Sequence, residues 1–402
     1  MYNNNFRSRN RGFGGGRSFA RRTPRPANGI NTNLFVNKAV EIPDQVSEPI
    51  THQFSDFSLN SQIVESVAKR GYLTPTIIQD KSIPLIMGGH DVIGIADTGT
   101  GKTAAFLLPL MHKFLKDRSQ KALIIVPTHE LAVQIEEDLR VFARGMNMFS
   151  ALCVGGSGYG GQLNALRRNP QFVIGTPGRL KDHVGRRSLR LHDFNNLVLD
   201  EADRMVEMGF ISDVRELISH LPTERQSLFF SATITPEVRS LISQFTRNPE
   251  SVSVKSRETS QNVDQNIVHY TDQFHKMSIL EQLLAQEDFK KVLIFGRTKH
   301  GVEKLNQSLA ERGFSAVSIH GNKTHSQRQR SLDEFKNGRT QIMVATDVAA
   351  RGLDIPNVSH VINFELPESY SDYVHRIGRT GRANQQGKAL TFVVGAPQPV
   401  SN

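Results

Sequence analysis

A glycine-rich run that ends in a lysine and a threonine is the stretch best suited to chemistry. Residues 96–103 lie between an apolar run at 92–96 and a run with helical character at 104–108. A strand, a small-residue turn and a helix in this order are typical of a phosphate-binding loop, whose N–H groups point at negative charge. Lys102 would reach the β- and γ-phosphates, and the Thr103 hydroxyl would serve Mg²⁺. The predicted nucleotide-binding residues are Ala96 (where the strict pattern has glycine), Asp97, Thr98, Gly99, Thr100, Gly101, Lys102 and Thr103.

Carboxylates at the end of another apolar run supply the expected partner of this loop. Residues 197–199 are apolar and precede Asp200, Glu201 and, after an alanine, Asp203. Asp200 would hold Mg²⁺ through water, and Glu201 would polarise the attacking water. Successive residues of a strand point to opposite faces, so adjacent acids can take separate roles.

Positive charge is concentrated near the N-terminus. Eight basic residues and no acid precede Glu41, whereas the rest of the chain carries only +2 of the net charge of +10. Residues 1–45 are rich in Asn, Gly and Arg, with interspersed Phe, and have too little apolar surface to offset the entropy of ordering. We predict a disordered arm that contacts RNA through charge and stacking. A merely solubilising tail and a transit peptide are the alternatives.

Cysteine usage and hydropathy limit the class of protein. The one cysteine, Cys153, excludes an intramolecular disulfide and a multi-thiolate zinc site, and it fits a reducing compartment. No apolar run approaches the roughly 18 residues of a membrane span, and the N-terminus lacks the apolar core of a secretory signal. We therefore expect a cytoplasmic protein with no membrane partner.

Strands and helices alternate from residue 54 onward. Near-continuously apolar strands separated by helical periodicity predict parallel sheets covered on both faces, with ligands beyond the strands' carboxyl ends. The fold class is therefore α/β, with two tandem parallel-sheet domains. The expected strands are 92–96, 122–126, 149–154, 172–175, 197–199, 227–230, 251–254, 267–270, 292–295, 316–319, 342–345, 360–364 and 390–394. The expected divisions are the tail at 1–45, a nucleotide-binding domain at 46–254, a polar linker at 255–265, a second domain at 266–395 and a short tail at 396–402.

The motifs of residues 54–394 resemble, in order, those of DEAD-box RNA helicases of the general bacterial type. The resemblance implies two RecA-like domains that bind ATP with Mg²⁺ and contact RNA without regard to base sequence. Residues 71–79, which include Thr74, are similar to the family's adenine-reading segment, and the Gln79 amide can both donate to and accept from a base edge. Phe54, or alternatively Phe57, would stack on the adenine.

The same resemblance implies roles for further residues. The predicted RNA contacts are Pro127, Thr128, Gly155, Gly156, Thr176, Arg179, Arg297, Thr346 and Asp347. Gln327 and Arg330 resemble RNA or interdomain contacts, and the residues implied to couple the domains are Asp203, Ser231, Thr233 and Arg351. Gly352 and Asp354 would contact the nucleotide, with Asp354 at the ribose.

A basic string near the end of the second series resembles the family's arginine fingers. If this string is helical, His375, Arg379 and Arg382 lie on one stripe, although Gly378 and Gly381 oppose a continuous helix. Arg379 and Arg382 would compensate charge at the γ-phosphate only when the domains close, which would couple hydrolysis to any ligand that spans both domains.

Two residues depart from the family pattern. Asp97 stands where the family usually has Gln, and His129 stands where it usually has Arg. Asp97 adds an acid near the triphosphate, and His129 removes a permanent charge from the RNA track and could make RNA binding weakly pH-dependent. Neither change touches Lys102, Glu201 or Arg379, so we expect activity to survive, and Arg297 is a candidate to restore the charge. No accessory C-terminal RNA domain is expected after Arg382.

The sequence therefore predicts an RNA-dependent ATPase that separates short RNA duplexes locally and remodels RNA–protein complexes. One alternative is a nucleotide-gated RNA clamp without productive unwinding. The other alternative is a DNA helicase or translocase built from the same two domains. The Gln79 segment and the full acid string favour the RNA family, whereas the basic tail alone suits either nucleic acid.

Overall fold

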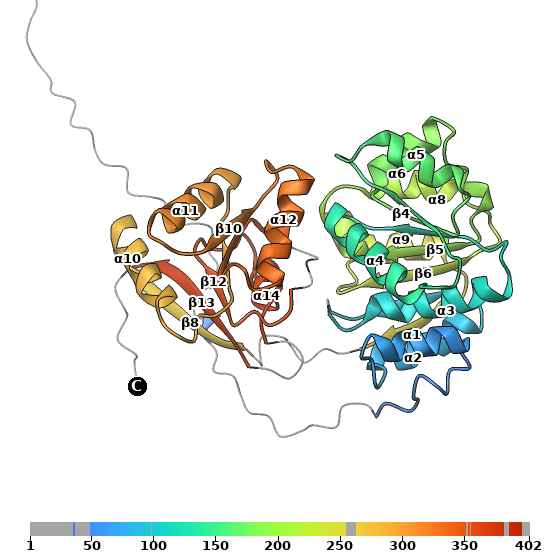
Figure 1. The fold of residues 1–402 in the computed structure, drawn as a ribbon, viewed down its shortest axis with the longest axis horizontal. Helices are drawn as coiled ribbons and strands as arrows, with labels where there is room; N and C mark the ends of the chain where they lie inside the picture. Colours follow the sequence, from blue (N-terminus) through green and yellow to red (C-terminus); the bar gives the residue numbers. More distant parts are fainter. Residues whose placement is uncertain are drawn as a thin grey trace, which may run out of the picture.

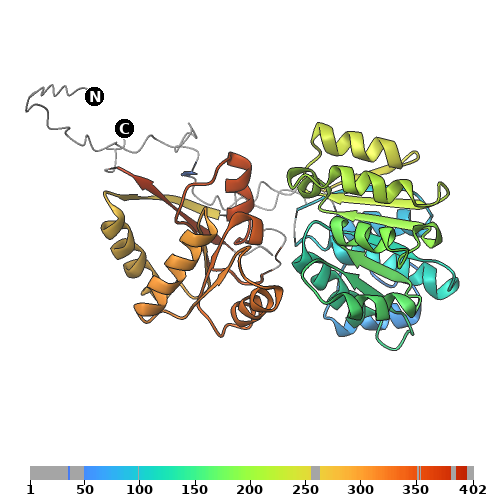
Figure 2. The same ribbon diagram turned by 90° about the horizontal axis from the view of Figure 1, so that it is seen from above.

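Two α/β domains lie side by side in the computed structural model, each with helices on both faces of its sheet (Figures 1 and 2). None of the helices in the described part of the chain is long and apolar enough to cross a membrane. The structure describes residues 35–36, 49–97, 99–254, 263–350, 353, 355–381 and 386–395.

Within the described residues, the sheet of the first domain has seven strands in the order β3-β4-β2-β5-β6-β1-β7. All of its neighbouring strands pair in parallel. The carboxyl ends of the strands therefore lie along one edge of the sheet, where ligands of such folds bind. The strands are β1 (Val92–Ile95), β2 (Ala122–Ile125), β3 (Ser150–Cys153), β4 (Phe172–Gly175), β5 (Asn196–Asp200), β6 (Gln226–Ser231) and β7 (Glu250–Ser253).

Alternate residues of these strands pack into two separate cores. Ile124 and Val198 belong to the core on one face, and Leu123 and Leu197 belong to the core on the other. Period-two alternation of side chains produces this division. The helices on the first face are α1 (Ser61–Lys69), α2 (Ile77–Met87), α3 (Lys102–Lys116) and α4 (His129–Phe142), and those on the second are α5 (Tyr159–Arg167), α6 (Pro177–Gly185), α7 (Ala202–Glu207), α8 (Ile211–Ser219) and α9 (Pro236–Phe245), with a 3₁₀ turn at Leu191–Asp193.

The sheet of the second domain has, in the part of the chain that the structure describes, six parallel strands in the order β10-β11-β9-β12-β13-β8. Its strands are β8 (Val263–Tyr270), β9 (Val292–Phe295), β10 (Ala316–Ile319), β11 (Ile342–Ala345), β12 (His360–Asn363) and β13 (Gly387–Val394). The helices are α10 (Gln273–Leu284), α11 (Lys299–Glu311), α12 (His325–Lys336), α13 (Asp347–Ala350) and α14 (Tyr370–Ile377). The α/β prediction and the two tandem sheets are confirmed.

Every predicted strand coincides with an observed one, and the largest differences are at the starts of β8 and β13. β8 begins at Val263, inside the predicted linker, because its first residues pair with β13 in a parallel ladder that starts at Val263 and Gly387. The linker prediction was therefore wrong at its C-terminal end. Composition shows that these residues are polar, but it does not show that a distant strand pairs with them.

Phe35 departs from the prediction of a disordered tail, because its side chain is completely buried in the second domain. It belongs to a core cluster with Val263, Tyr373, Ile377 and Ala389. Its ring centroid lies 4.4 Å from that of Tyr373, at an interplanar angle of 40°. Phe35 thus attaches the chain to α14 of the second domain, although in the sequence it precedes the first domain.

We expect Phe35→Ala to destabilise the packing of α14 and β13 by about 3 kcal/mol, because truncating a buried phenylalanine costs about 3–5 kcal/mol. Hydrogen exchange of the amides in these two elements measures the change. Phe19→Ala, in the predicted arm, is the matched control and should leave exchange unaltered. Equal exchange in the Phe35→Ala variant and the parent chain would mean that this ring contributes nothing to the second domain.

Candidate nucleotide and RNA site

The predicted site residues of the first domain gather at the carboxyl edge of its sheet. The phosphate loop follows β1, and the carboxylate string begins at the last residue of β5. These residues come together because all the strands run in the same direction. The predicted residues that end or closely follow the other strands are Pro127 and Thr128 (β2), Gly155 and Gly156 (β3), Thr176 (β4) and Ser231 (β6).

The phosphate loop is shaped to surround an anion. Gly101 has a φ of +93°, and a side chain there would overlap the amide of Gln79. α3 begins at Lys102, and among the described residues no side chain caps it, so its first N–H groups can bind a phosphate. Lys102 is 6% exposed, and its Nζ donates to the carbonyl of Ala96 at 2.9 Å. The lysine therefore lies folded inside the loop.

Gln79 connects the adenine-reading segment to the phosphate loop. Its Oε1 accepts the N–H of Thr76 at 3.0 Å, and its Nε2 donates to the carbonyl of Gly101 at 3.0 Å. Thr74, earlier in the segment, is exposed. The two candidate stacking residues, Phe54 and Phe57, are equally buried and lie edge to face with ring centroids 6.0 Å apart. Both rings belong to the core cluster that also contains Ile78 of this segment.

The acids at the end of β5 are buried beside the loop. Burial raises the pKa of Asp200 to about 6, although the charge of Lys102 opposes that rise. Glu201 adopts a left-handed φ of +54°, a strained conformation for a residue other than glycine. Its Oε2 is buried and has no hydrogen-bond partner within the described residues, and Nη1 of Arg204 lies 3.6 Å away. An acceptor of this kind is suited to a hydrogen bond from water.

Asp203 binds the residues after β6 that were predicted to couple the domains. Its Oδ2 accepts both the N–H and the Oγ1 hydroxyl of Thr233 at 2.9 Å, and its own N–H donates to the Oγ of Ser231 at 3.1 Å. The Ser231 hydroxyl in turn donates to the carbonyl of Thr233 at 2.8 Å. The carboxylate string and the residues after β6 therefore form one hydrogen-bonded unit.

The predicted RNA residues of the first domain divide into a buried set and a more accessible one. Pro127 and Thr128 are buried, and Thr128 caps α4 by accepting the N–H of Leu131 at 3.3 Å. The second set lies on adjacent loops, because β3 pairs with β4 and Thr176 donates its N–H to the Cys153 carbonyl at 3.1 Å. In this set Gly156 is exposed, whereas Gly155, Thr176 and Arg179 are half-buried, and Nη1 of Arg179 donates to the Ser157 carbonyl at 3.3 Å.

In the second domain, Asp347 is bound by Arg376 and does not project freely. Nε and Nη2 of Arg376 donate to its two carboxylate oxygens at 2.6 and 2.7 Å, and the arginine is 1% exposed. Nη1 donates to the carbonyl of Glu365 at 2.7 Å. Asp347 thus holds its turn in place, and an RNA contact by its side chain stays a prediction. Arg297 is exposed and Thr346 is half-buried.

The basic string at 375–382 does not continue as one helix. α14 ends at Ile377 with Gly378 as the C-cap residue, so His375 lies on the helix and Arg379 lies beyond it. Arg379 is 6% exposed, and it donates to the carbonyls of Leu353 at 2.8 Å and His375 at 3.3 Å. To serve as an arginine finger it would exchange these bonds for a phosphate, and that role stays a prediction. The predicted residues that lie outside the described part of the chain are Thr98, Arg351, Gly352, Asp354 and Arg382.

Side chains without a predicted role connect the two domains. Nη2 of Arg204, in α7, donates to the carbonyl of Val348, in α13, at 2.8 Å. Nη2 of Arg328, in α12, lies 3.0 Å from Oε1 of Glu130, in α4. The edge of the second domain that carries α12 faces the first domain (Figure 1). The carboxylate unit and the start of α4 thus both contact the second domain.

The sequence predicts RNA or interdomain contacts for Gln327 and Arg330. In the structure Gln327 caps its own helix by accepting the N–H of Thr324 at 2.9 Å, and Arg330 is exposed, so an RNA contact by either residue stays a prediction. Among the described residues of α12, His325 and Arg328 reach the first domain. The sequence signal that could have identified His325 and Arg328 is Thr324, because a helix that begins after this N-cap residue places residues 325 and 328 on one face.

Two family models match the chain: DEAD/DEAH box helicase over residues 76–241 and Helicase conserved C-terminal domain over residues 275–384. The chain is 44% identical over 342 residues to the ATP-dependent RNA helicase CshA of Listeria monocytogenes, a match that covers 85% of this chain and 66% of that protein. It is 43% identical over 346 residues to the DEAD-box ATP-dependent RNA helicase CshA of Bacillus subtilis, covering 86% and 70%. The chain thus spans about two thirds of the length of these curated relatives.

Solved structures with the same two-domain fold include S. cerevisiae Dbp5 bound to RNA and ADP BeF3. That similarity has a TM-score of 0.76 at 28% sequence identity and covers 86% of this chain and 90% of that chain. The two family models contain the phosphate loop, the acids after β5 and the second-domain motifs whose geometry is given above. The chain belongs to the DEAD-box family of ATP-dependent RNA helicases.

Proposed function

We propose that RNA stimulates ATP hydrolysis in this protein and that closure of the two domains separates short RNA duplexes locally, without processive movement. The observation that carries the proposal is the position of Arg204. This side chain lies beside the Glu201 carboxylate and also donates to the carbonyl of Val348 in the second domain. The residue suited to activate water and the contact between the domains are therefore parts of one cluster, so a change in domain arrangement acts directly on hydrolysis.

The residues at the carboxyl edge fit ATP with Mg²⁺. Lys102 can exchange the Ala96 carbonyl for a phosphate oxygen, and the buried Asp200 carboxylate and the Thr103 hydroxyl can hold the ion. The ion, when bound, neutralises charge on the phosphates. Glu201 would accept a hydrogen bond from the attacking water through Oε2, which has no hydrogen-bond partner among the described residues. We assign the adenine to the segment of Gln79.

RNA would lie across the turns after β3 and β4 of the first domain and the facing turns of the second. Gly155, Gly156 and Thr176 offer backbone N–H groups and a hydroxyl, and Arg179 and Arg297 offer charge, which suits a sugar–phosphate track. The solved structures of Dbp5 and of Mss116p contain RNA together with a nucleotide analogue, and they support RNA as the partner. The basic arm before Phe35 is attached to the second domain through that residue, from which it can add contacts of low specificity.

Single-stranded RNA should raise the steady-state rate of ATP hydrolysis, and Glu201→Gln should lower that rate by about 10²–10⁴-fold, the usual contribution of a general base. ATP binding should persist in the variant, because the phosphate loop is unchanged. Glu137→Gln, at an exposed site on α4, is the control. ATP binding without RNA-stimulated turnover in the parent chain would favour the nucleotide-gated clamp instead.

Thr233→Ala should reduce duplex separation about tenfold or more while changing RNA-stimulated ATP hydrolysis much less. The substitution removes one hydrogen bond to the Asp203 carboxylate, and such a charged bond contributes about 1.5–3 kcal/mol. Parallel assays of ATP hydrolysis and of strand release from a short RNA duplex measure the two effects. Ser243→Ala, exposed on α9, is the control. Equal losses in both assays would show that Thr233 does not couple them.

The Mg²⁺ concentration for half-maximal ATP hydrolysis should rise about fourfold between pH 7.5 and pH 5.5. Because the pKa of Asp200 is raised to about 6, a proton competes with the ion for this carboxylate below that pH. The required Mg²⁺ concentration rises at low pH because protonation of Asp200 removes the negative charge that attracts the ion. Titration of Mg²⁺ at both pH values tests this, and an unchanged requirement would show that Asp200 does not hold the ion.

A further inference from the structure

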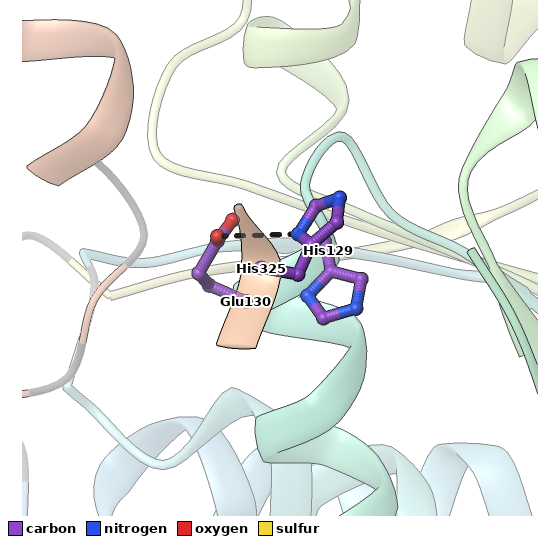
Figure 3. Close-up of side chains that lie close together, drawn as sticks. All are labelled: His129, Glu130 and His325. Atoms are coloured by element: carbon purple, nitrogen blue, oxygen red, sulfur yellow. Dashed lines mark ion pairs between the residues drawn. The ribbon is translucent and has the colours of Figure 1, made fainter. Parts of the chain in front are cut away.

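Four side chains from two helices meet where the domains touch. His129 and Glu130 begin α4, and His325 and Arg328 lie on the first turn of α12. The imidazoles of His129 and His325 are stacked, with ring centroids 3.8 Å apart and an interplanar angle of 29°. Figure 3 shows these rings lying against each other, with the Glu130 carboxylate directed at His325. Glu130 Oε1 lies 4.0 Å from Nδ1 of His325 and 3.0 Å from Nη2 of Arg328.

The hydrogen bonds of this cluster determine the charge of His325. Nη2 of Arg328 lies 2.6 Å from its Nδ1. A guanidinium only donates hydrogen bonds, so this nitrogen of the ring must accept. The backbone of Gly155 also makes a hydrogen bond with His325 that favours a proton on the ring, as a carbonyl acceptor would. One nitrogen therefore carries a proton and the other does not, which is the neutral form of imidazole.

We propose that His129 and His325 must both be uncharged for the two domains to adopt this contact, so that mild acid disfavours closure. The proposal rests on the proposed function, in which closure drives hydrolysis and strand separation. A proton on Nδ1 of His325 would face the guanidinium of Arg328 and break their hydrogen bond. Two protonated rings stacked at 3.8 Å would repel each other, and the single carboxylate of Glu130 is already paired with Arg328.

The groups around the two rings offer little to compensate an added charge. α4 supplies Glu130, which is 7% exposed, and α12 supplies the cation Arg328, which is 16% exposed. The loop after β3 contributes neutral groups: the Gly155 backbone, Gly156, and the Ser157 hydroxyl 3.3 Å from Nε2 of His129. His325 approaches this loop closely at Gly156, where an added Cβ would overlap the His325 ring.

The direction of the pKa shifts of the two rings agrees with the geometry of the contact. Burial, then the charges of His325 and Arg328, lower the pKa of His129 to about 4. Burial and Arg328 also lower the pKa of His325, although Glu130 and the Gly155 backbone oppose that shift. When the domains separate, both rings regain the ordinary value near 6.5. Protons therefore bind the separated form more tightly, and closure is favoured above about pH 6.5 and lost as the pH falls below it.

Two histidines and a glutamate could also bind a divalent transition metal such as Zn²⁺, since their ligand atoms lie within 4.8 Å of one another. In this cluster, however, Arg328 already contacts both Glu130 and Nδ1 of His325. A metal would have to displace that cation from two of the three ligands. The arrangement thus favours a proton-sensitive contact over a metal site.

Energy transfer between two dyes, one on each domain, tests the proposal. The dyes are attached at Ser219→Cys in the first domain and Glu287→Cys in the second, both exposed positions, because the native Cys153 is buried. The closed fraction is measured with a non-hydrolysable ATP analogue, saturating Mg²⁺ and a single-stranded oligouridine. Between pH 7.5 and pH 5.5 the closure equilibrium should weaken about tenfold for each histidine, and about a hundredfold for both.

Matched variants separate this effect from other titrations. In His129→Gln with His325→Gln, an amide can still accept from Arg328 and donate to a carbonyl, but it does not titrate in this range. The double variant should keep its closed fraction at pH 5.5, and each single variant should retain about a tenfold loss. His300→Gln, exposed on α11, is the control and should behave like the parent chain. Effects of pH on Asp200 or on the nucleotide are common to all variants and cancel in the comparison.

The outcomes are distinguishable. If the parent chain does not close with nucleotide and RNA at pH 7.5, the proposed function fails. Closure at pH 7.5 that persists unchanged at pH 5.5 would overturn the proton-sensitive contact alone. The same loss of closure in the double variant as in the parent chain would also overturn it, because the proton would then act elsewhere.

Discussion

The positions of the site residues follow from the parallel direction of the strands in both sheets. Because the strands of the first sheet run the same way, the turns after them meet at one edge, although they come from segments spread over more than a hundred residues. The phosphate loop, the acids after β5 and the threonine after β6 become neighbours for this reason. The second sheet repeats the arrangement, and its helices α12 and α13 carry the residues that contact the first domain.

Charged side chains of the site are buried, and the partners of each side chain determine what it can do. Arg376 is almost completely buried, and its bidentate bond to Asp347 together with the bond to the Glu365 carbonyl satisfies it. Such a pair is structural, since removal of one partner would leave the other charge uncompensated. Glu201 is different, because one of its oxygens has no hydrogen-bond partner among the described residues. The first arrangement holds a turn in place, whereas the second leaves a carboxylate ready for water.

The contact between α4 and α12 gives the departure at His129 a physical meaning. From the sequence, His129 was expected to weaken a track for RNA and to make RNA binding weakly pH-dependent. In the structure its ring stacks on His325 of the other domain, so its protonation acts on the contact between domains. A neutral imidazole can stack on its partner in this contact, and once the domains separate it becomes a cation as the pH falls below about 6.5. The same residue type at an exposed RNA turn would only change affinity.

Local patterns along the chain were enough to predict the strands, the two domains and the nucleotide-binding motifs. Apolar runs of strand length marked every strand to within a few residues, and the phosphate loop and the acids of β5 were recognisable because local order along the chain defines them. The contacts between distant side chains depend on the folded arrangement of the two domains. Arg204, His325 and Arg328 act through partners more than a hundred residues away, and Phe35 lies in a stretch whose composition predicted disorder. Local patterns carry no information about a partner that a distant strand or helix supplies, and for that reason the domain contacts became visible only in the folded chain.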